Sequence, residues 1–268
     1  MRRPASWRFG IVVALAWAVL AFLLLPAFVA VPFSLTPERY LALPSQSVSL
    51  RHYVNLFASE DWLSSIGQSV FVALCTTALA VILGTLCAVG LWRVSSRFAE
   101  TVRGFILTPV IVPPIVSALA FYRIWVDLRL LDSYAGLILA HTVLAVPYVV
   151  ITVSTSLANF DLRLEQAARN LGASMGRTLR RVILPSIAPG VLSGAVFAFI
   201  LSWDEIVVTL FITSLRVFTL PRRMWDGIRE HVDPTIAAAA TTLLVITVIG
   251  TVLQVIISRR RVAHGKRA

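Results

Sequence analysis

The chain has 268 residues, of which 58% are hydrophobic and only 14% are charged. Soluble domains carry about 25% charged residues, so this composition excludes a protein whose whole surface faces water. The formal net charge of +11 does not indicate a nucleic-acid partner, because the arginines lie in short segments between long apolar stretches. Cys75 and Cys87 fall within one predicted helix, about 18 Å apart and too far for a disulfide. We therefore expect an all-α membrane protein.

Six stretches are apolar enough to cross a bilayer, which requires about 20 residues. They are residues 11–33, 66–92, 104–126, 135–157, 189–213 and 236–258. We predict that the first is a retained helix, because its apolar run exceeds the roughly 7–15 residues of a cleaved signal peptide. The chain then divides into an N-terminal segment (1–10), one bundle of six transmembrane helices (11–258) and a basic tail (259–268).

The placement of arginine and lysine predicts the orientation of the bundle. The N-terminal segment, residues 93–103, residues 158–188 and the tail carry three, three, five and five of these residues, whereas the alternate segments carry two, one and four. Because positive residues collect on the cytoplasmic side, both termini and the long segment 158–188 are expected there. Residues 38–61 and 214–233 are expected to face outward.

Two features suggest that the bundle has a working interior. The third stretch contains Pro109, Pro113 and Pro114 and the fourth contains Pro147. Each proline bends its helix, which lipid tolerates only where protein or a cavity repairs the bonding, although any one of these bends could also be static. The fifth stretch carries small residues at a four-residue spacing, which lets another backbone approach, either from another subunit or from this chain. These small residues are Gly190, Gly194, Ala198 and Ser202.

Asp204 and Glu205 are the only acidic residues inside the six predicted spans. Charged residues at membrane depth usually mark a function, and two carboxylates in the outer half of a span favour a path for a cation. Aromatic neighbours could add cation–π contacts, and the candidates are Trp203, Tyr122 and Trp125. The alternative is an internal ion pair with Arg123.

His141 and Tyr148 share one face of the fourth span. This pairing is typical of packing or hydrogen bonding. Since no second ligand with zinc-like spacing is present, we predict no metal site.

The cytoplasmic segment 158–188 reads as a helix, a glycine and a second helix. Asp161 is a candidate cap for the first helix and Gly172 a candidate stop, and Pro185 is expected to end the second helix before the bilayer. Such a loop could dock a soluble motor, or it could be a structured connection with no partner.

The motif within this segment resembles the EAA loop of binding-protein-dependent importer permeases. It comprises Gln166, Ala167, Ala168, Gly172, Val182, Leu184 and Pro185. Gln166 stands where the family has glutamate, with Glu165 directly before it, and Val182 replaces isoleucine. The resemblance covers nearly the whole chain and is strongest to the spermidine/putrescine branch. It is carried by residues 136–142, Pro147-Tyr148, residues 202–208 and Leu220-Pro221.

The resemblance implies a type I ABC importer permease fold in the bacterial inner membrane. A short helix at 173–179 would enter a cleft of an ATPase subunit, and the coupling residues would be Glu165, Gln166, Ala167, Ala168, Gly172, Ala173, Ser174, Leu184 and Pro185. The implied partners are a second permease chain, two ATPases and an external substrate-binding protein.

The chain itself is not expected to be an enzyme or to hold a cofactor. It lacks a phosphate-binding loop, and its single lysine is Lys266, so ATP and Mg²⁺ would be bound by the partner ATPase. Polyamine is the implied substrate. The alternatives are the same type of permease for iron, phosphonate or opine, a secondary transporter, or a membrane enzyme using Asp204, Glu205 and His141.

Overall fold

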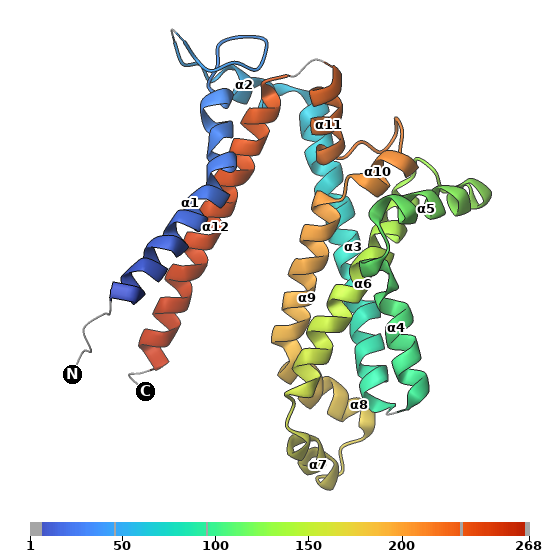
Figure 1. The fold of residues 1–268 in the computed structure, drawn as a ribbon. Helices are drawn as coiled ribbons and strands as arrows, with labels where there is room; N and C mark the ends of the chain where they lie inside the picture. The colour runs from blue at the N-terminus through green and yellow to red at the C-terminus, as the bar shows by residue number, and fades with distance from the viewer. Residues whose placement is uncertain (1–6, 46, 95, 231–232, 266–268) are drawn as a thin grey trace. The chain divides into compact units, whose positions relative to one another are not determined.

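The computed structural model describes residues 7–45, 47–94, 96–230 and 233–265, and all regular structure in these ranges is helical (Figure 1). The elements are α1 (Trp7–Ser34), α2 (Arg51–Ala58), α3 (Glu60–Arg93), α4 (Arg97–Ile111), α5 (Pro114–Leu128), α6 (Tyr134–Ala158), α7 (Leu162–Asn170), α8 (Met175–Thr178), the π-helical turn η1 (Leu179–Ile183), α9 (Leu184–Asp204), α10 (Val207–Ile212), α11 (Leu220–Glu230) and α12 (Thr235–Gly265). Five of these stretches are long and apolar enough to cross a membrane, or six if the bent pair α4–α5 is one span.

The chain divides into two compact units, the first comprising Met1–Leu63 with Met224–Ala268. Within this unit α1 and α12 lie side by side and antiparallel (Figure 1). Asn55 Nδ2 on α2 donates to Thr235 Oγ1 at the start of α12, at 2.9 Å. The helix α12 continues through Gly265, so the described part of the predicted tail is a continuation of the last span.

The second unit, Ser64–Arg223, is built around the packing of α6 on α9. The apolar core here includes Val149 and Val153 of α6 and Ile187 and Ala198 of α9. The four small residues of α9 are all buried. A Cβ on Gly194 would lie 2.7 Å from Thr152 Oγ1, so α6 fills the groove that the glycines leave. The small residues of α9 could have met another subunit or this chain, and in the structure they pack within the chain against α6.

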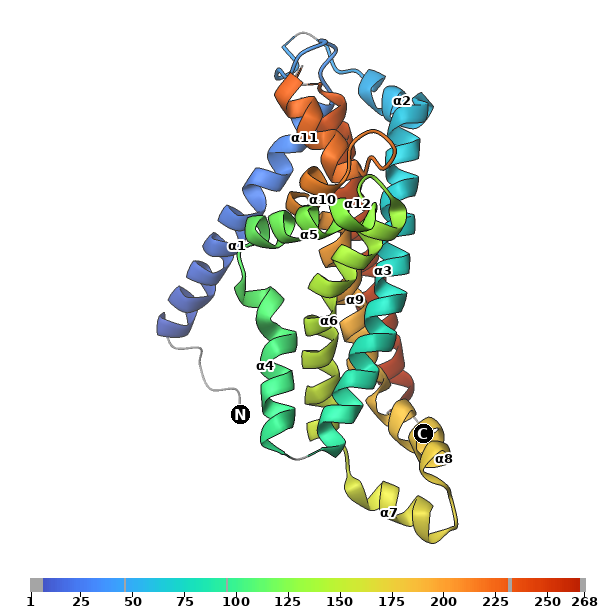
Figure 2. The same cartoon turned by 90° about the vertical axis from the view of Figure 1, so that its right-hand side faces the viewer.

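The third predicted span, 104–126, is sharply bent, as its prolines indicated. The chain bends by 104° between α4 and α5, as Figure 2 shows. The break falls at Val112-Pro113. Val112 is extended (φ −71°, ψ 129°), as the residue before a proline prefers, and Pro114 begins α5, where its missing N–H costs no bond.

The fifth predicted span is also interrupted. Helix α9 ends at Asp204, and the short α10 begins at Val207 after two non-helical residues. At the other end, Pro185 does not end a helix as expected. The helix runs from Met175 to Asp204, and Pro185 lies in the first turn of α9. The wide π turn before it relieves the clash that a proline ring normally makes with the carbonyl four residues earlier.

Candidate functional site

The loop between α6 and α9 has the predicted helix–glycine–helix form. Asp161 Oδ1 accepts a hydrogen bond from Arg163 N at 2.9 Å and caps α7. Gly172 adopts φ +82°, which glycine reaches without strain. Gly172 N donates to Arg169 O and Ala173 N to Ala168 O, which is the double bond pattern of a Schellman motif. The capped start and the glycine stop of α7 are therefore confirmed.

Glu165, and not the next residue Gln166, is the side chain of α7 that points inward. Glu165 is only 6% exposed and its Oε1 accepts from Arg93 Nη1 of α3 at 2.7 Å, whereas Gln166 is exposed. The departure from the family pattern at Gln166 therefore removes no ion pair within the described chain. Glu165 supplies the acid one position earlier.

The remaining coupling candidates lie on the surface of this loop or in the first turn of α9. Ala167, Ser174, Leu184 and Pro185 are exposed, and Ala168 and Ala173 are half-buried. The expected helix at 173–179 begins at Met175 instead, and it is the first turn of the long helix leading into α9. The loop also exposes large apolar side chains, namely Leu162, Leu164, Leu171 and Met175, with Leu171 at 89%.

Glu205 lines a small cavity where the two broken helices of this unit meet. The cavity has a volume of about 130 Å³ and is lined by Pro109, Val110, Val112, Pro114, Ser117, Leu144, Tyr148, Leu201 and Glu205. Of these lining residues, Glu205 alone carries a charge. Irregular backbone at membrane depth is tolerated where it is buried in protein or lines a cavity, and both breaks meet that condition.

The break at Glu205 is held by its own hydrogen bonds. Glu205 Oε1 accepts from Val208 N at 2.9 Å, and its carbonyl accepts from Thr209 Oγ1 at 2.8 Å. Behind it, the buried His141 bridges the two pieces of the broken helix, with Nδ1 at 2.9 Å from Ser202 Oγ and Nε2 at 3.3 Å from Thr209 Oγ1. His141 is thus a hydrogen-bonding residue, as its spacing indicated. Among the described residues no group of three metal-ligating side chains occurs.

The other predicted path residues do not line this cavity. Asp204 is exposed, and Trp203 is half-buried with its ring stacked on Phe199 at 6.0 Å. Tyr122 is exposed on α5. Trp125 is buried and its Nε1 donates to Gly136 O at 2.9 Å, so it fixes α5 against α6.

The alternative of an ion pair between Arg123 and the acidic pair is wrong. Arg123 Nη1 instead contacts Asp127 Oδ1 at 2.7 Å, because the residue four positions on lies on the same helix face. Sequence reasoning also gave Tyr148 no part in a cation path. In the structure Tyr148 lines the cavity that contains Glu205 and stacks on Phe197. The proline directly before it marked the position, but not which side the ring would take.

Asp132 also fixes a distant loop, and it was not identified from the sequence. It lies in the α5–α6 loop with φ +50°, and its carboxylate accepts the N–H groups of Ser214, Leu215, Arg216 and Val217 at 2.8–3.2 Å. Burial raises the pKa of this carboxyl, but the four N–H groups outweigh burial, and the net pKa lies below its ordinary value. No sequence signal could have found this site, because its partners are more than 80 residues away.

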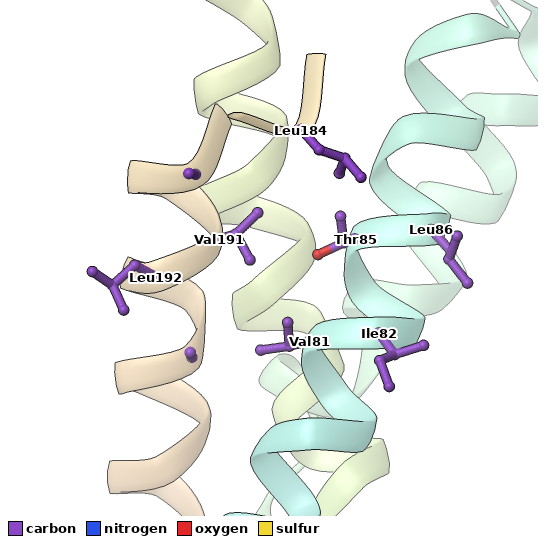
Figure 3. A pocket seen from close by; sticks show the side chains of 9 residues that line it. Val81, Ile82, Thr85, Leu86, Leu184, Val191 and Leu192 are labelled. Atoms are coloured by element: carbon purple, nitrogen blue, oxygen red, sulfur yellow. The ribbon is translucent and has the colours of Figure 1, made fainter. Parts of the chain in front are cut away.

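A larger cavity lies between α3 and α9 and has a different character. Its volume is about 510 Å³, and Figure 3 shows side chains from the two helices facing it. It is lined by Val81, Ile82, Thr85, Leu86, Leu184, Ala188, Val191, Leu192 and Ala195. Without a charged group in this lining, the cavity suits lipid chains or an apolar protein surface and not a charged solute.

Comparison with known proteins agrees with this architecture. The family described as binding-protein-dependent transport system inner membrane component matches residues 80–262. The chain is 32% identical over 253 residues to the spermidine/putrescine transport system permease protein PotC of Haemophilus influenzae, covering 94% of this chain and 98% of that protein. It is also 32% identical over 203 residues to the putrescine transport system permease protein PotI of Escherichia coli, covering 73% and 72%.

A solved bacterial ABC transporter involved in the import of the acidic polysaccharide alginate contains a chain of the same fold. The TM-score is 0.72 at 15% identity, and the match covers 95% of this chain and 98% of that chain. The predicted all-α importer permease fold is confirmed. The chain is a multi-pass membrane protein that belongs to the family of inner membrane components of binding-protein-dependent transport systems.

Proposed function

We propose that the chain is a permease subunit of an ATP-driven polyamine importer and that the α7–Gly172–α8 loop docks the motor. The observation that carries this proposal is the loop itself. It is capped at Asp161, ordered by the Schellman motif at Gly172 and tied to α3 through Glu165, yet it exposes leucines such as Leu171. Four large apolar side chains, Leu162, Leu164, Leu171 and Met175, are exposed within fourteen residues of this ordered loop, which suits a surface that a partner covers.

The positive-inside rule supports a cytoplasmic location for this loop and for both termini. The partners would then be ATPase subunits, two in number, which bind ATP and Mg²⁺. A second, different permease chain and an external substrate-binding protein would complete the importer. The family description, which names a binding-protein-dependent system, supports this assignment.

Polyamine is supported by the relatives and by the chemistry of the cavity between the broken helices. Two similar proteins bear names that specify spermidine or putrescine. Glu205 supplies one carboxylate in a cavity of about 130 Å³, in which a water molecule takes about 30 Å³, so there is room for an ammonium end and adjoining methylenes. Asp204, Trp203 and Tyr122 complete the proposed path outside this cavity, and Trp125 holds α5 in place behind it.

The test is uptake of radiolabelled putrescine and spermidine by the complete importer, assembled with its partner ATPase, permease and binding-protein chains. Glu205→Gln is expected to reduce uptake by about tenfold, because a neutral amide no longer attracts a cation at a site of low polarity. Asp127→Asn is the matched control, since this exposed acid pairs only with Arg123 among the contacts described.

Unchanged uptake in Glu205→Gln, with the control also unchanged, would refute the cation path. An importer that transports iron, phosphonate or opine and not polyamine would correct the substrate and leave the permease assignment in place. Uptake by this chain alone, without ATPase subunits, would indicate a secondary transporter.

A further inference from the structure

The cytoplasmic end of α3 is joined to the coupling loop by two contacts, and a third contact within α3 links the residues that make them. Arg93 Nη1 lies 2.7 Å from Glu165 Oε1 of α7. The ring of Trp92 packs edge-on against Phe160, with centroids 6.0 Å apart, and the Arg93 guanidinium lies 4.5 Å over the Trp92 ring. The last two residues of α3 therefore hold both the entry to the loop and its first helix.

The ion pair lies where both helix dipoles favour it. Arg93 is in the last turn of α3, where the helix end attracts a cation, and Glu165 is in the first turn of α7, where it attracts an anion. Glu165 is almost fully buried, and a buried charge that loses its partner is strongly unfavourable. The junction therefore resists separation of α3 from α7.

Arg93 has an unused donor as well. Its Nη2 is buried and has no hydrogen-bond partner among the described residues. A guanidinium can donate from both terminal nitrogens, so Arg93 keeps the N–H bonds of Nη2 for a carbonyl or carboxylate that approaches when the loop moves or a partner binds.

The opposite end of α3 holds an outer loop in a comparable way. Gln68 Oε1 accepts from Phe218 N, and Ser69 Oγ accepts from Leu220 N, both at 2.8 Å. Gln68 and Arg93 are 25 residues apart on one helix, about 38 Å along its axis. Figure 1 shows α3 as one continuous helix. One continuous helix thus contacts the coupling loop at one end and the α10–α11 loop at the other.

We infer that Arg93 is a positioning residue for energy coupling: through Glu165 it makes α3 follow the displacement that the ATPase imposes on α7, and α3 carries this displacement to the outer loop. The inference rests on the proposed function, because it takes the loop to be the ATPase contact. It adds a specific route, which runs through α3 of the same chain and is independent of which solute is transported.

The test uses the complete importer in liposomes and measures uptake per ATP hydrolysed. Arg93→Glu and Glu165→Arg, each alone, are expected to lower this ratio by about three- to tenfold, the range by which residues along a coupling route change it. The charge-swapped double variant should recover most of the loss. Arg93→Lys should be intermediate, since it keeps the charge without the forked geometry. Arg97→Glu, exposed at the start of α4, is the control and should leave the ratio unchanged.

The outcomes separate the inference from the function on which it rests. If the wild-type complex shows no ATP-dependent uptake, the proposed function fails. If the wild-type complex works and Arg93→Glu keeps the wild-type ratio, the inference is overturned. If the two single reversals do not assemble, Arg93→Lys decides. A wild-type ratio in that variant would mean that Arg93 only stabilises the fold and would overturn the inference, whereas a reduced ratio in an assembled complex would support it.

Discussion

Replacing Gly194 by alanine is the most direct test of how α6 and α9 pack. A Cβ on Gly194 would lie 2.7 Å from Thr152 Oγ1, 3.1 Å from Val149 Cα and 3.3 Å from Val149 Cγ1. The Val149 Cα belongs to the backbone of a buried helix, so the added methyl group cannot be accommodated by a side-chain rotation alone. The two helices must move apart, and overpacking of this kind costs about 1–3 kcal/mol.

The assay is thermal unfolding of the purified chain in detergent. A loss of about 1–3 kcal/mol should lower the midpoint by roughly 2–10 °C for a protein of this size. Gly90→Ala is the matched control, because Gly90 is also helical and a Cβ there has no neighbour within 4 Å. That substitution should be neutral or stabilising by up to about 1 kcal/mol, from helix propensity.

Equal midpoints for Gly194→Ala and Gly90→Ala would refute the packing described here. If Gly194→Ala weakened only the assembled importer and not the isolated chain, the small-residue face would contact another subunit in place of α6.

Two further predictions concern the loops. Lowering the pH should destabilise the α10–α11 loop that Asp132 holds. Because folding lowers the pKa of Asp132, its contribution to stability is fully present above the ordinary value of 3.8 and is lost as the pH falls through the lower folded value. Asp132→Asn should remove this pH dependence and lower the local stability of the loop by about 1 kcal/mol. The measurement is proteolysis or hydrogen exchange of residues 214–217 between pH 6 and about pH 3. A pH profile that the substitution leaves unchanged would contradict the role of Asp132. Gly172→Ala should cost about 1–2 kcal/mol because φ is +82°, and should reduce ATPase co-purification, whereas the helical Gly176→Ala should not; equal recovery in both would show that the turn at Gly172 is not required.

The sequence was sufficient to locate the apolar helices and the capped α7–Gly172–α8 loop, because both depend on local composition. Runs of apolar residues predict spans whatever their partners, and Asp161 and Gly172 act on the backbone within a few residues of themselves. The same locality explains why prolines at 113 and 114 were recognised as a bend. The size of the bend, 104°, depends on how α5 packs against α10, which no local pattern specifies.

The candidate site was only partly predictable, for a related reason. The acidic pair was evident as charge within an apolar stretch, but which carboxylate faces the cavity depends on where α9 stops. The helix ends at Asp204, which turns Glu205 toward Tyr148 and the α4–α5 break and leaves Asp204 exposed. The bonds from Arg93 to Glu165 and from Asp132 to residues 214–217 join segments more than 70 residues apart, so only the folded chain brings them together.

The central claim is that the α7–Gly172–α8 loop lies in the cytoplasm and is bound by an ATPase. The most direct measurement replaces Ser174 by cysteine after Cys75 and Cys87 have been changed to alanine, and labels the exposed thiol with a membrane-impermeant maleimide. We expect labelling in inverted vesicles only, with protection when the ATPase subunits are bound. Labelling from the outer side, or labelling that bound ATPase does not reduce, would contradict it.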